Sequence, residues 1–260
     1  MAKITYIIPG LTNGVTYYGK VFSVNPKKRA NGRADLTVFA AVPSAFPAEP
    51  TDYTLIAKYT TSQTWVAPED GWFKIEIHGA SGNGGMCNSD YEYDYDADIE
   101  EVWGHTGGSG GGGAYVCSAF KLKAGDVLTL VRGTVGSDTS VTAESSMETY
   151  STMVATSGGN GTKASGTTSG ATKGQGGRGG VASGGNITNV NGSAGSNGAY
   201  HKYDYGATVN GPAGGAPGHA DGNTGGRGGG FKGTTAASIS PGSGSAGFIK
   251  ISRGNTNVVA

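Results

Sequence analysis

The sequence predicts an all-β chain organised around a glycine-rich stretch that runs from about residue 104 to residue 247. Glycine makes up 50 of the 260 residues, nearly a fifth of the chain, whereas about 7% is usual. Segments with the composition of β-strands stand on both sides of this stretch. Many of the glycines fall three residues apart: Gly104, Gly107, Gly110 and Gly113; Gly174, Gly177 and Gly180; Gly192, Gly195 and Gly198; and Gly222, Gly225 and Gly228.

A period of three residues belongs to neither an α-helix nor a β-strand. It matches the extended helix of polyproline II geometry, in which one edge in three can approach a neighbour only if it lacks a side chain. A flexible linker is the simplest alternative, but the stretch is longer than a linker needs and carries Val, Ile, Phe, Tyr and Trp. Collagen is excluded because the repeat soon breaks and proline is scarce. We therefore predict a bundle of short polyglycine II helices whose backbone groups bond between segments.

The N-terminal part of the chain reads as extended segments. β-branched and aromatic residues gather at 15–24 and again at 36–40, which indicates two strands. A proline-rich joint follows, with Pro43, Pro47 and Pro50, and marks the boundary between domains. The predicted division is a β segment at 1–46, a linker at 47–52 and a glycine-rich domain at 53–260.

The scaffold for the bundle comes from strands before and after it. Phe73, Ile75 and Ile77 alternate with polar residues, which is the pattern of a half-buried strand. Because glycine loses much conformational entropy on folding, a bundle of glycine segments needs such a scaffold to hold its ends. The other predicted strands cover residues 53–59, 65–67, 116–122, 127–131 and 246–252.

Composition excludes several classes of function. The formal net charge is +0 and the pI about 6.9, so nothing favours nucleic acid or an anionic membrane surface. No apolar run approaches the roughly 20 residues of a membrane span, and residues 1–10 lack the apolar core of a signal peptide. Cys87 and Cys117 bracket the first glycine run, and the sequence leaves open whether they pair or stay free.

The order of motifs in 53–252 resembles the glycine-rich domain of phage tail and fibre proteins. The matching residues are 65–68, 73–80 followed by Gly82, Gly84 and Gly85, 110–115, 122–126 and 244–251. The resemblance implies a jelly-roll-like β-sandwich from which polyglycine helices project. It also implies a virion protein outside the cell, with a bacterial surface glycan or outer protein and other tail proteins as partners. Because fibres are commonly trimeric, it further implies a homotrimer.

A second resemblance concerns the N-terminal segment. Residues 8–18, followed by Val21 and Val24, resemble the tyrosine-corner region of a fibronectin type III domain. Only the final strands of that domain are present here. The segment is thus either a fragment of a module from a longer chain or a piece that completes a sheet elsewhere.

The acidic, tyrosine-rich insert at 90–103 is the most distinctive local feature. Asp94, Asp96 and Asp98 supply oxygens two residues apart, so a calcium site is one hypothesis, although the glycine and final glutamate of an EF-hand loop are not in place. A contact loop is the second hypothesis, because tyrosine supplies large area at low entropic cost. A solvated loop without a role is the third.

A second aromatic loop, 200–205, interrupts the glycine runs in the same way, and the two loops suggest one binding surface if the fold brings them together. The Ser/Thr-rich insert at 137–157 is expected to form another tip loop. The predicted receptor-binding residues are Tyr91, Tyr93, Tyr95, Trp103, Tyr200, His201, Tyr203 and Tyr205.

Enzyme signatures are missing from the sequence. No Gly-x-Ser-x-Gly elbow has the required strand and helix around it, and no phosphate-binding loop occurs. The four histidines, His78, His105, His201 and His219, lie far apart in the sequence, so each reads as a surface or packing residue. We therefore expect a non-enzymatic protein that binds no cofactor, with calcium as the one exception.

Three functions remain. The first is a phage tail or fibre adhesin that recognises a bacterial surface through loops projected by the bundle. The second is a structural domain that decorates or caps a tail and binds no receptor. The third is a bacterial surface adhesin with the same module. The tyrosine-rich loops favour the first.

Overall fold

The computed structural model describes residues 17–20, 38–41, 49–94, 99–166, 168–204, 208–232 and 236–255. In these residues the fold is all-β, with antiparallel sheets and no helix, as the sequence predicts. The chain divides into two units, Met1–Ala48 and Glu49–Ala260. In the first unit, β1 (Tyr17–Lys20) pairs antiparallel with β2 (Val38–Ala41); β1 lies inside the first segment expected to be extended, and β2 overlaps the second. The other residues of the fibronectin-like segment lie outside the described ranges.

The second unit contains two five-stranded sheets, both antiparallel, in the orders β13-β8-β5-β18-β3 and β12-β11-β10-β9-β4. The first is built from β3 (Tyr53–Tyr59), β5 (Gly71–His78), β8 (Tyr115–Leu122), β13 (Thr188–Val190) and β18 (Phe248–Gly254). The second is built from β4 (Gln63–Val66), β9 (Val127–Val131), β10 (Thr139–Glu144), β11 (Met153–Ala155) and β12 (Ala182–Ser183).

The two sheets share one apolar core. Phe73, Ile75 and Ile77 of β5 are fully buried, as the alternation in the sequence predicts, and they pack in one cluster with Leu130 of β9 and Val141 of β10. Burying an Ile or Phe side chain stabilises a fold by about 1.5–3 kcal/mol. This core therefore supplies the scaffold that holds the glycine segments.

One correction concerns residues 137–157, which we expected to form a tip loop. Two parts of this insert form β10 and β11, inner strands of the second sheet, in which Val141 and Met153 are fully buried and directly opposite each other. In β10 the polar Ser140 and Thr142 alternate with buried positions, as in any strand with one face in the core. The likeness to a jelly roll stays a prediction, as do the domain boundaries.

The glycine-rich stretch is built around a central segment, residues 106–114. Each of its nine N–H groups donates to a carbonyl of another segment, and the acceptor changes with a period of three. Gly107, Gly110 and Gly113 donate to residues 223–229 at 2.8–3.1 Å. Gly108, Gly111 and Ala114 donate to carbonyls of residues 156–162. Thr106, Ser109 and Gly112 donate to carbonyls of residues 193–199. Successive residues of the central segment therefore face three different neighbours.

Three more segments donate to the carbonyls of the central segment. Residues 79–85 bond to it antiparallel, through Gly82 N to Gly111 O at 3.0 Å, for example. Residues 174–180 and 212–218 run parallel to it and repeat the period, as with Gly177 N to Ser109 O at 2.8 Å. The central segment is therefore enclosed by six others, and its backbone polar groups find partners without forming a sheet.

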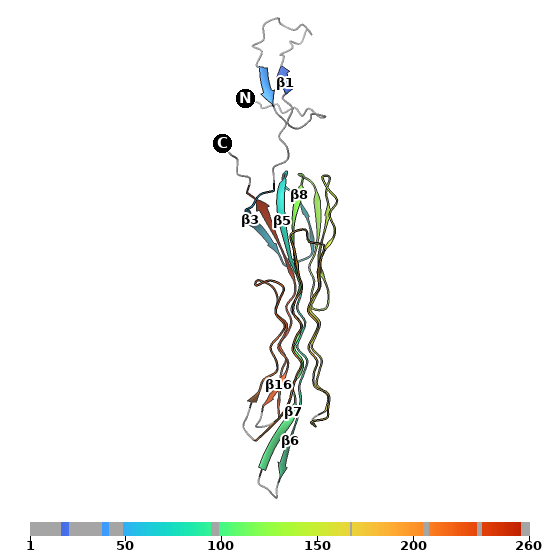
Figure 1. The fold of residues 1–260 in the computed structure, drawn as a ribbon, viewed down its shortest axis with the longest axis vertical. Coiled ribbons are helices and arrows are strands. Elements are labelled where there is room, and N and C mark those ends of the chain that lie inside the picture. The colour runs from blue at the N-terminus through green and yellow to red at the C-terminus, as the bar shows by residue number, and fades with distance from the viewer. Residues whose placement is uncertain are drawn as a thin grey trace. The chain divides into compact units, whose positions relative to one another are not determined.

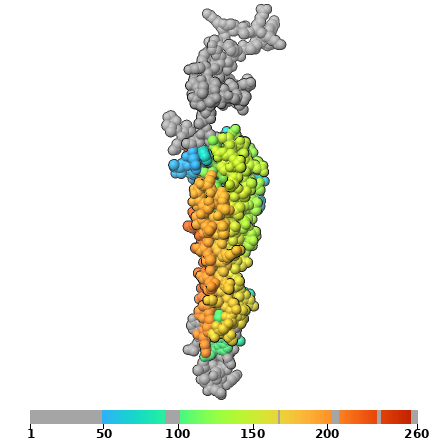
Figure 2. All heavy atoms as spheres, turned by 45° about the vertical axis from the view of Figure 1, so that its right-hand side comes forward, coloured from blue at the N-terminus to red at the C-terminus, as the bar shows by residue number. Residues whose placement is uncertain are grey.

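The six outer segments form a closed ring, because each bonds to the next. The order around the ring is the order in the sequence: 79–85, 156–162, 174–180, 193–199, 212–218 and 223–229, and the last bonds back to the first through Gly226 N to Gly82 O. In Figure 2 the segments of residues 190–230 (orange) lie alongside those of 150–180 (yellow-green) down the length of the unit.

Close approach of backbones explains the glycine content of the bundle. A Cβ atom added at Gly177 would collide with the carbonyl of Gly159, and one at Gly111 with the carbonyl of Arg178. Exposure follows the same period in the outer ring: Gly174, Gly177 and Gly180 are buried, whereas Gln175, Arg178 and Val181 are exposed. Side chains are thus present only where a segment faces solvent.

Three strands of the first sheet continue directly into the bundle. β5 ends at His78 and leads into 79–85, 106–114 leads into β8, and β18 follows the glycines that end at Gly247. In Figure 1 the second unit has β3, β5 and β8 at one end, the glycine segments along its length, and β6, β7 and β16 at the other. The bundle therefore separates the sandwich from a second, smaller set of strands.

Candidate functional site

The end of the bundle away from the sandwich carries a three-stranded antiparallel sheet, which we call the distal sheet. Its strands are β14 (Tyr200–Asp204), β7 (Ile99–His105) and β6 (Asn88–Asp94), in that order. The two tyrosine-rich segments of the sequence therefore contribute the edge strands of one sheet, with β7 between them. Tyr91 and Tyr203 are the register partners of Val102 on its two sides.

The distal sheet is anchored by a small apolar cluster. Val102 is fully buried and packs with Cys87, Val209 and Phe231. Phe231 belongs to a second three-stranded sheet, made of β15 (Thr208–Val209), β16 (Gly230–Lys232) and β17 (Ser238–Ile239). Two hydrogen bonds join the same parts, from Cys87 Sγ to Gly230 O at 2.8 Å and from Ser89 Oγ to Ala236 O at 2.7 Å. The distal sheet is thus held against the neighbouring segments by packing and by hydrogen bonds.

The predicted contact residues are distributed over all three strands. Tyr91 and Tyr93 lie on β6, Trp103 lies half-buried on β7, and Tyr200, His201 and Tyr203 lie on β14. Tyr95 and Tyr205 lie outside the described residues. Lys202 forms an ion pair with Glu101 across β14 and β7, at 2.8 Å. An exposed pair of this kind contributes little to stability, about 0–1 kcal/mol.

The calcium hypothesis rests on residues that the structure describes only in part. Asp94 lies at the end of β6, whereas Asp96 and Asp98 fall outside the described ranges. Within the described parts of the chain, no group of three or more His, Cys, Asp or Glu side chains is placed to hold a metal ion. The hypothesis therefore stays a prediction.

The two cysteines are both buried free thiols. Cys87 bonds to Gly230 O next to the distal sheet, whereas Cys117 lies on β8 in the sandwich sheet. Burial raises the pKa of the Cys117 thiol. It is therefore less reactive than an exposed cysteine.

The four histidines, which the sequence separates widely, fall into two pairs. His201 carries a lowered pKa because it is partly buried and because His105 lies near enough to repel its charged form. His105 is 3% exposed and is the register partner of Tyr200, and the two ring centroids lie 5.1 Å apart. This pair lies where the bundle meets the distal sheet.

The other pair lies where the sandwich meets the bundle. The His78 ring stacks on Phe248, with 4.1 Å between the ring centroids. The His219 ring lies 5.6 Å from the His78 ring and stacks on Tyr115 at 4.5 Å. His78 is 1% exposed, and neither ring nitrogen has a hydrogen-bond partner among the described residues. Burial lowers the pKa of His78 to about 4, and Lys250 and His219 add to that shift. The cluster closes the end of the sheet with stacked rings.

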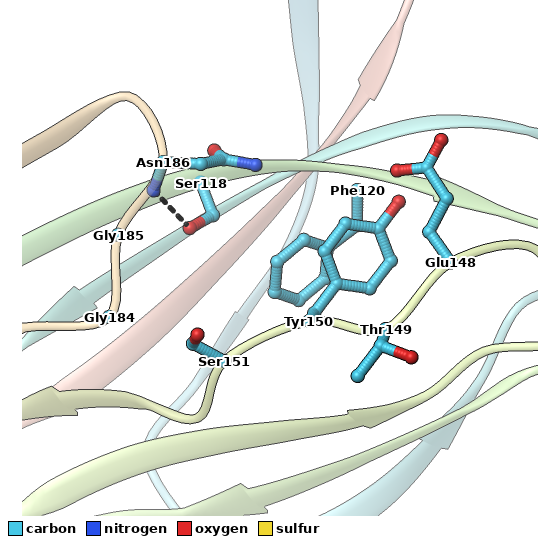
Figure 3. Close-up of a pocket in the computed structure, with 9 residues that line it drawn as sticks. All are labelled: Ser118, Phe120, Glu148, Thr149, Tyr150, Ser151, Gly184, Gly185 and Asn186. Carbon is cyan, nitrogen blue, oxygen red and sulfur yellow. Dashed lines mark hydrogen bonds between the residues drawn. The ribbon is translucent and has the colours of Figure 1, made fainter.

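A cavity of about 380 Å³ opens at the side of the sandwich. Figure 3 shows the Phe120 and Tyr150 rings side by side in it, with Glu148 beyond them and Asn186 bonded to Ser118. Tyr150 Oη accepts from Lys121 N at 2.8 Å, and Asn186 pairs with both backbone groups of Ala119. Burial raises the pKa of Tyr150 to about 12. Because these polar groups are already hydrogen-bonded to the backbone, we interpret the cavity as part of the packing between strands.

A further cavity, of about 520 Å³, lies beside the distal sheet. His105 and Tyr200 line it together with residues of 169–175 and 197–199. Sequence reasoning identified Tyr200 as a contact residue, but it assigned His105 to the surface or to packing and did not single out residues 169–175. No local signal marks them, because the pairing of His105 with Tyr200 joins residues that are far apart in the chain.

Compared with known proteins, the chain matches no family model, and no curated protein is similar enough to count as a relative. Among the residues that the structure describes, no helix has the length and apolar composition needed to cross a bilayer.

Proposed function

We propose that this chain is a receptor-binding protein of a phage tail or fibre, an adhesin that binds a bacterial surface glycan or protein through the distal sheet. The observation that carries the proposal is the sheet order β14-β7-β6, which sets the two tyrosine-rich segments on either side of one central strand. We further propose that the protein works by binding and not by catalysis, and that it acts on the virion, outside the cell, as a homotrimer beside other tail proteins.

The construction of the second unit supports this proposal. A bundle in which the central N–H groups are all bonded to neighbouring segments is suited to act as a stiff spacer. It holds the distal sheet away from the sandwich (Figure 1). Binding residues held on a rigid scaffold lose less entropy when a partner docks, and tyrosine offers large contact area for few rotatable bonds.

We also propose that the bundle segments are polyglycine II helices and that the sandwich is jelly-roll-like. The three-residue period of hydrogen bonding and the ring of six neighbours support the first assignment, because a helix with three residues per turn presents three edges. A likeness between the sequence motifs and phage glycine-rich domains supports the second.

The test is binding of the labelled chain to a panel of bacterial strains, beside a variant in which Tyr91, Tyr93, Tyr95, Tyr203 and Tyr205 are changed to Ser. We expect strain-selective binding that the variant loses. A matched control changes Leu55 and Ile56 to Ser, because these exposed apolar residues lie on β3 in the sandwich. This control should bind as the unchanged chain does.

Two results would count against the proposal. Selective binding that survives the five tyrosine changes would move the receptor site away from the distal sheet. Binding to no strain of a broad panel would remove the adhesin function and leave a structural role on the tail as the function to test. Thermal unfolding of each variant must first show that its fold is intact.

A further inference from the structure

The buried imidazole of His78 lies against the 219–222 turn, which joins the outer segments 212–218 and 223–229 at the sandwich end of the bundle. A Cβ atom placed on Gly222 would lie 3.5 Å from His78 Nδ1, so this turn covers that side of the ring. Neither ring nitrogen has a hydrogen-bond partner among the described residues, and the residue is 1% exposed. A neutral imidazole has one donor and one acceptor, and a charged one has two donors. With the turn closed, both nitrogens are unsatisfied, which is costly in a folded protein.

The turn is anchored on both sides but weakly held in between. Gly218 N and Asn223 Nδ2, which flank it, donate to backbone carbonyls of other segments at 2.9–3.0 Å. Between these anchors, the backbone hydrogen bond that the structure describes is internal to the turn, from Gly222 N to His219 O at 2.8 Å. Ala220 and Asp221 are exposed. The turn can therefore open without breaking a backbone hydrogen bond between the segments of the bundle.

The side-chain contacts of the turn depend on protonation. Asp221 forms an ion pair with Lys250, with 2.7 Å between Oδ2 and Nζ. His219 Nδ1 accepts from Asp221 N at 3.3 Å, and a proton on Nδ1 would remove that acceptor. The His219 and His78 rings lie 5.6 Å apart, so charge on one disfavours charge on the other. Acid therefore weakens the attachment of the turn while it also favours a charge on the ring beneath.

Charged and titratable groups face His78 from several elements. They are Glu76 on β5, Tyr115 on β8, Lys250 on β18, and His219 and Asp221 on the turn, with Lys58 of β3 over the stacked Phe248 ring. Glu76 is already engaged by Tyr115 Oη at 2.7 Å and by Lys74 Nζ at 3.5 Å. Burial in the first place, then Lys250 and His219, lower the pKa of His78 to about 4, despite the opposite effect of Glu76 and Asp221. A proton on His78 is thus better accommodated once water reaches the ring.

We propose that the 219–222 turn is an acid-sensitive latch, closed over His78 at neutral pH and opened when that ring takes up a proton. Opening gives both ring nitrogens access to water, separates Asp221 from Lys250 and uncovers the stacked rings below. It also frees the connection between segments 212–218 and 223–229, so the ring of outer segments is less firmly closed at its sandwich end. This inference goes beyond the adhesin function and does not depend on it.

Amide hydrogen exchange, followed for single residues by NMR and corrected for the intrinsic effect of pH, tests the latch. The N–H of Gly222 is bonded within the turn and reports its opening, whereas the N–H of Gly177 is bonded between bundle segments. Because the pKa of His78 is about 4 when the turn is closed and about 6.5 in water, the opening constant should rise about 100-fold between pH 7 and pH 4. We expect the protection of Gly222 to fall by that factor, and to lie below the protection of Gly177 at every pH.

Two histidine variants assign the effect to one ring. His78→Phe keeps a ring in the stack on Phe248 and takes up no proton, so most of the acid-dependent fall at Gly222 should disappear. His201→Phe is the matched control, because it removes a histidine of the distal sheet and should keep the full fall. Thermal unfolding of each variant at pH 7 must first show that it folds. If His78→Phe does not fold, the comparison of Gly222 with Gly177 in the unchanged chain still decides.

Three results would overturn the latch. Equal protection of Gly222 and Gly177 at every pH would mean that the turn opens only when the whole unit unfolds. Protection of Gly222 that does not change between pH 7 and pH 4 would mean that acid does not open the turn. A full acid-dependent fall that persists in His78→Phe would mean that another group controls it.

Discussion

The buried imidazole of His78 has no hydrogen bond to lose among the described residues, so its charge is set by its surroundings. The Phe248 ring stacks on one side of it, and Lys250 and His219 lie near enough to disfavour its charged form, against the opposite effect of Glu76 and Asp221. Burial in the first place, then Lys250 and His219, lower its pKa to about 4. The unfolded chain therefore binds a proton at His78 near pH 6.5, before the folded chain does.

This difference predicts a loss of stability on acidification. The contribution of His78 is fully present above pH 6.5 and is lost as the pH falls toward 4, by about 3 kcal/mol in the free energy of unfolding. His78→Phe keeps a ring in the stack and cannot take up a proton. Urea unfolding at several pH values should show that the variant loses correspondingly less stability between pH 6.5 and 4. Equal losses in both proteins would contradict the assignment.

A pair of adjacent residues tests the packing of the bundle. Gly177→Val places a side chain against the Gly159 carbonyl and should lower the free energy of unfolding by about 1–3 kcal/mol or more. Arg178→Val introduces the same side chain at the next, exposed position and should change stability by no more than about 0.5 kcal/mol. Denaturant unfolding of both variants measures the difference. Similar effects at the two positions would argue against close backbone packing.

The glycine period in the sequence identifies packing positions without saying which neighbour each one meets. Gly177, Gly195 and Gly225 lie against carbonyls of other segments, as the threefold pattern predicts for an edge that approaches a neighbour. Gly222 has the same spacing but belongs to a turn, in which its N–H donates to His219 O at 2.8 Å. A repeat in sequence cannot distinguish these two cases, because both require a residue without a side chain.

At the scale of elements, the central segment should be among the most protected parts of the chain. Its N–H groups are bonded on three sides and residues 104–114 are buried, so their exchange requires the bundle to open. We expect hydrogen exchange at Gly107–Gly113 to be as slow as in β5, and far slower than at the exposed turn 168–173. Mass spectrometry of peptic fragments measures all three regions. Exchange of the glycines within seconds would restore the linker interpretation.

The strands were predictable where apolar residues alternate and not where composition is polar. Phe73, Ile75 and Ile77 identify β5 from the sequence alone. Val141 and Met153 do not identify β10 and β11, because Ser and Thr surround them and their burial depends on strands from elsewhere in the chain. The sequence also named both tyrosine-rich segments, but only the register with β7 brings them into one sheet.

For the second unit as a whole, the continuity of strand and bundle predicts one cooperative transition. β5 runs into 79–85 and 106–114 runs into β8 with no intervening linker, so strain in the bundle is transmitted to the sandwich. Gly111→Val, at the centre of the bundle, forces a side chain against the Arg178 carbonyl. If this lowers the free energy of unfolding by about 2 kcal/mol, the unfolding temperature should fall by about 4–8 °C. Calorimetry should record a single peak, shifted as a whole, while the exposed Thr224→Val leaves it in place.

A variant that instead shows two peaks, the upper one at the original temperature, would mean that the sandwich folds independently and the bundle is an appendage. Such a bundle would not hold the distal sheet rigidly, and the spacer role proposed for it would fail with the cooperativity.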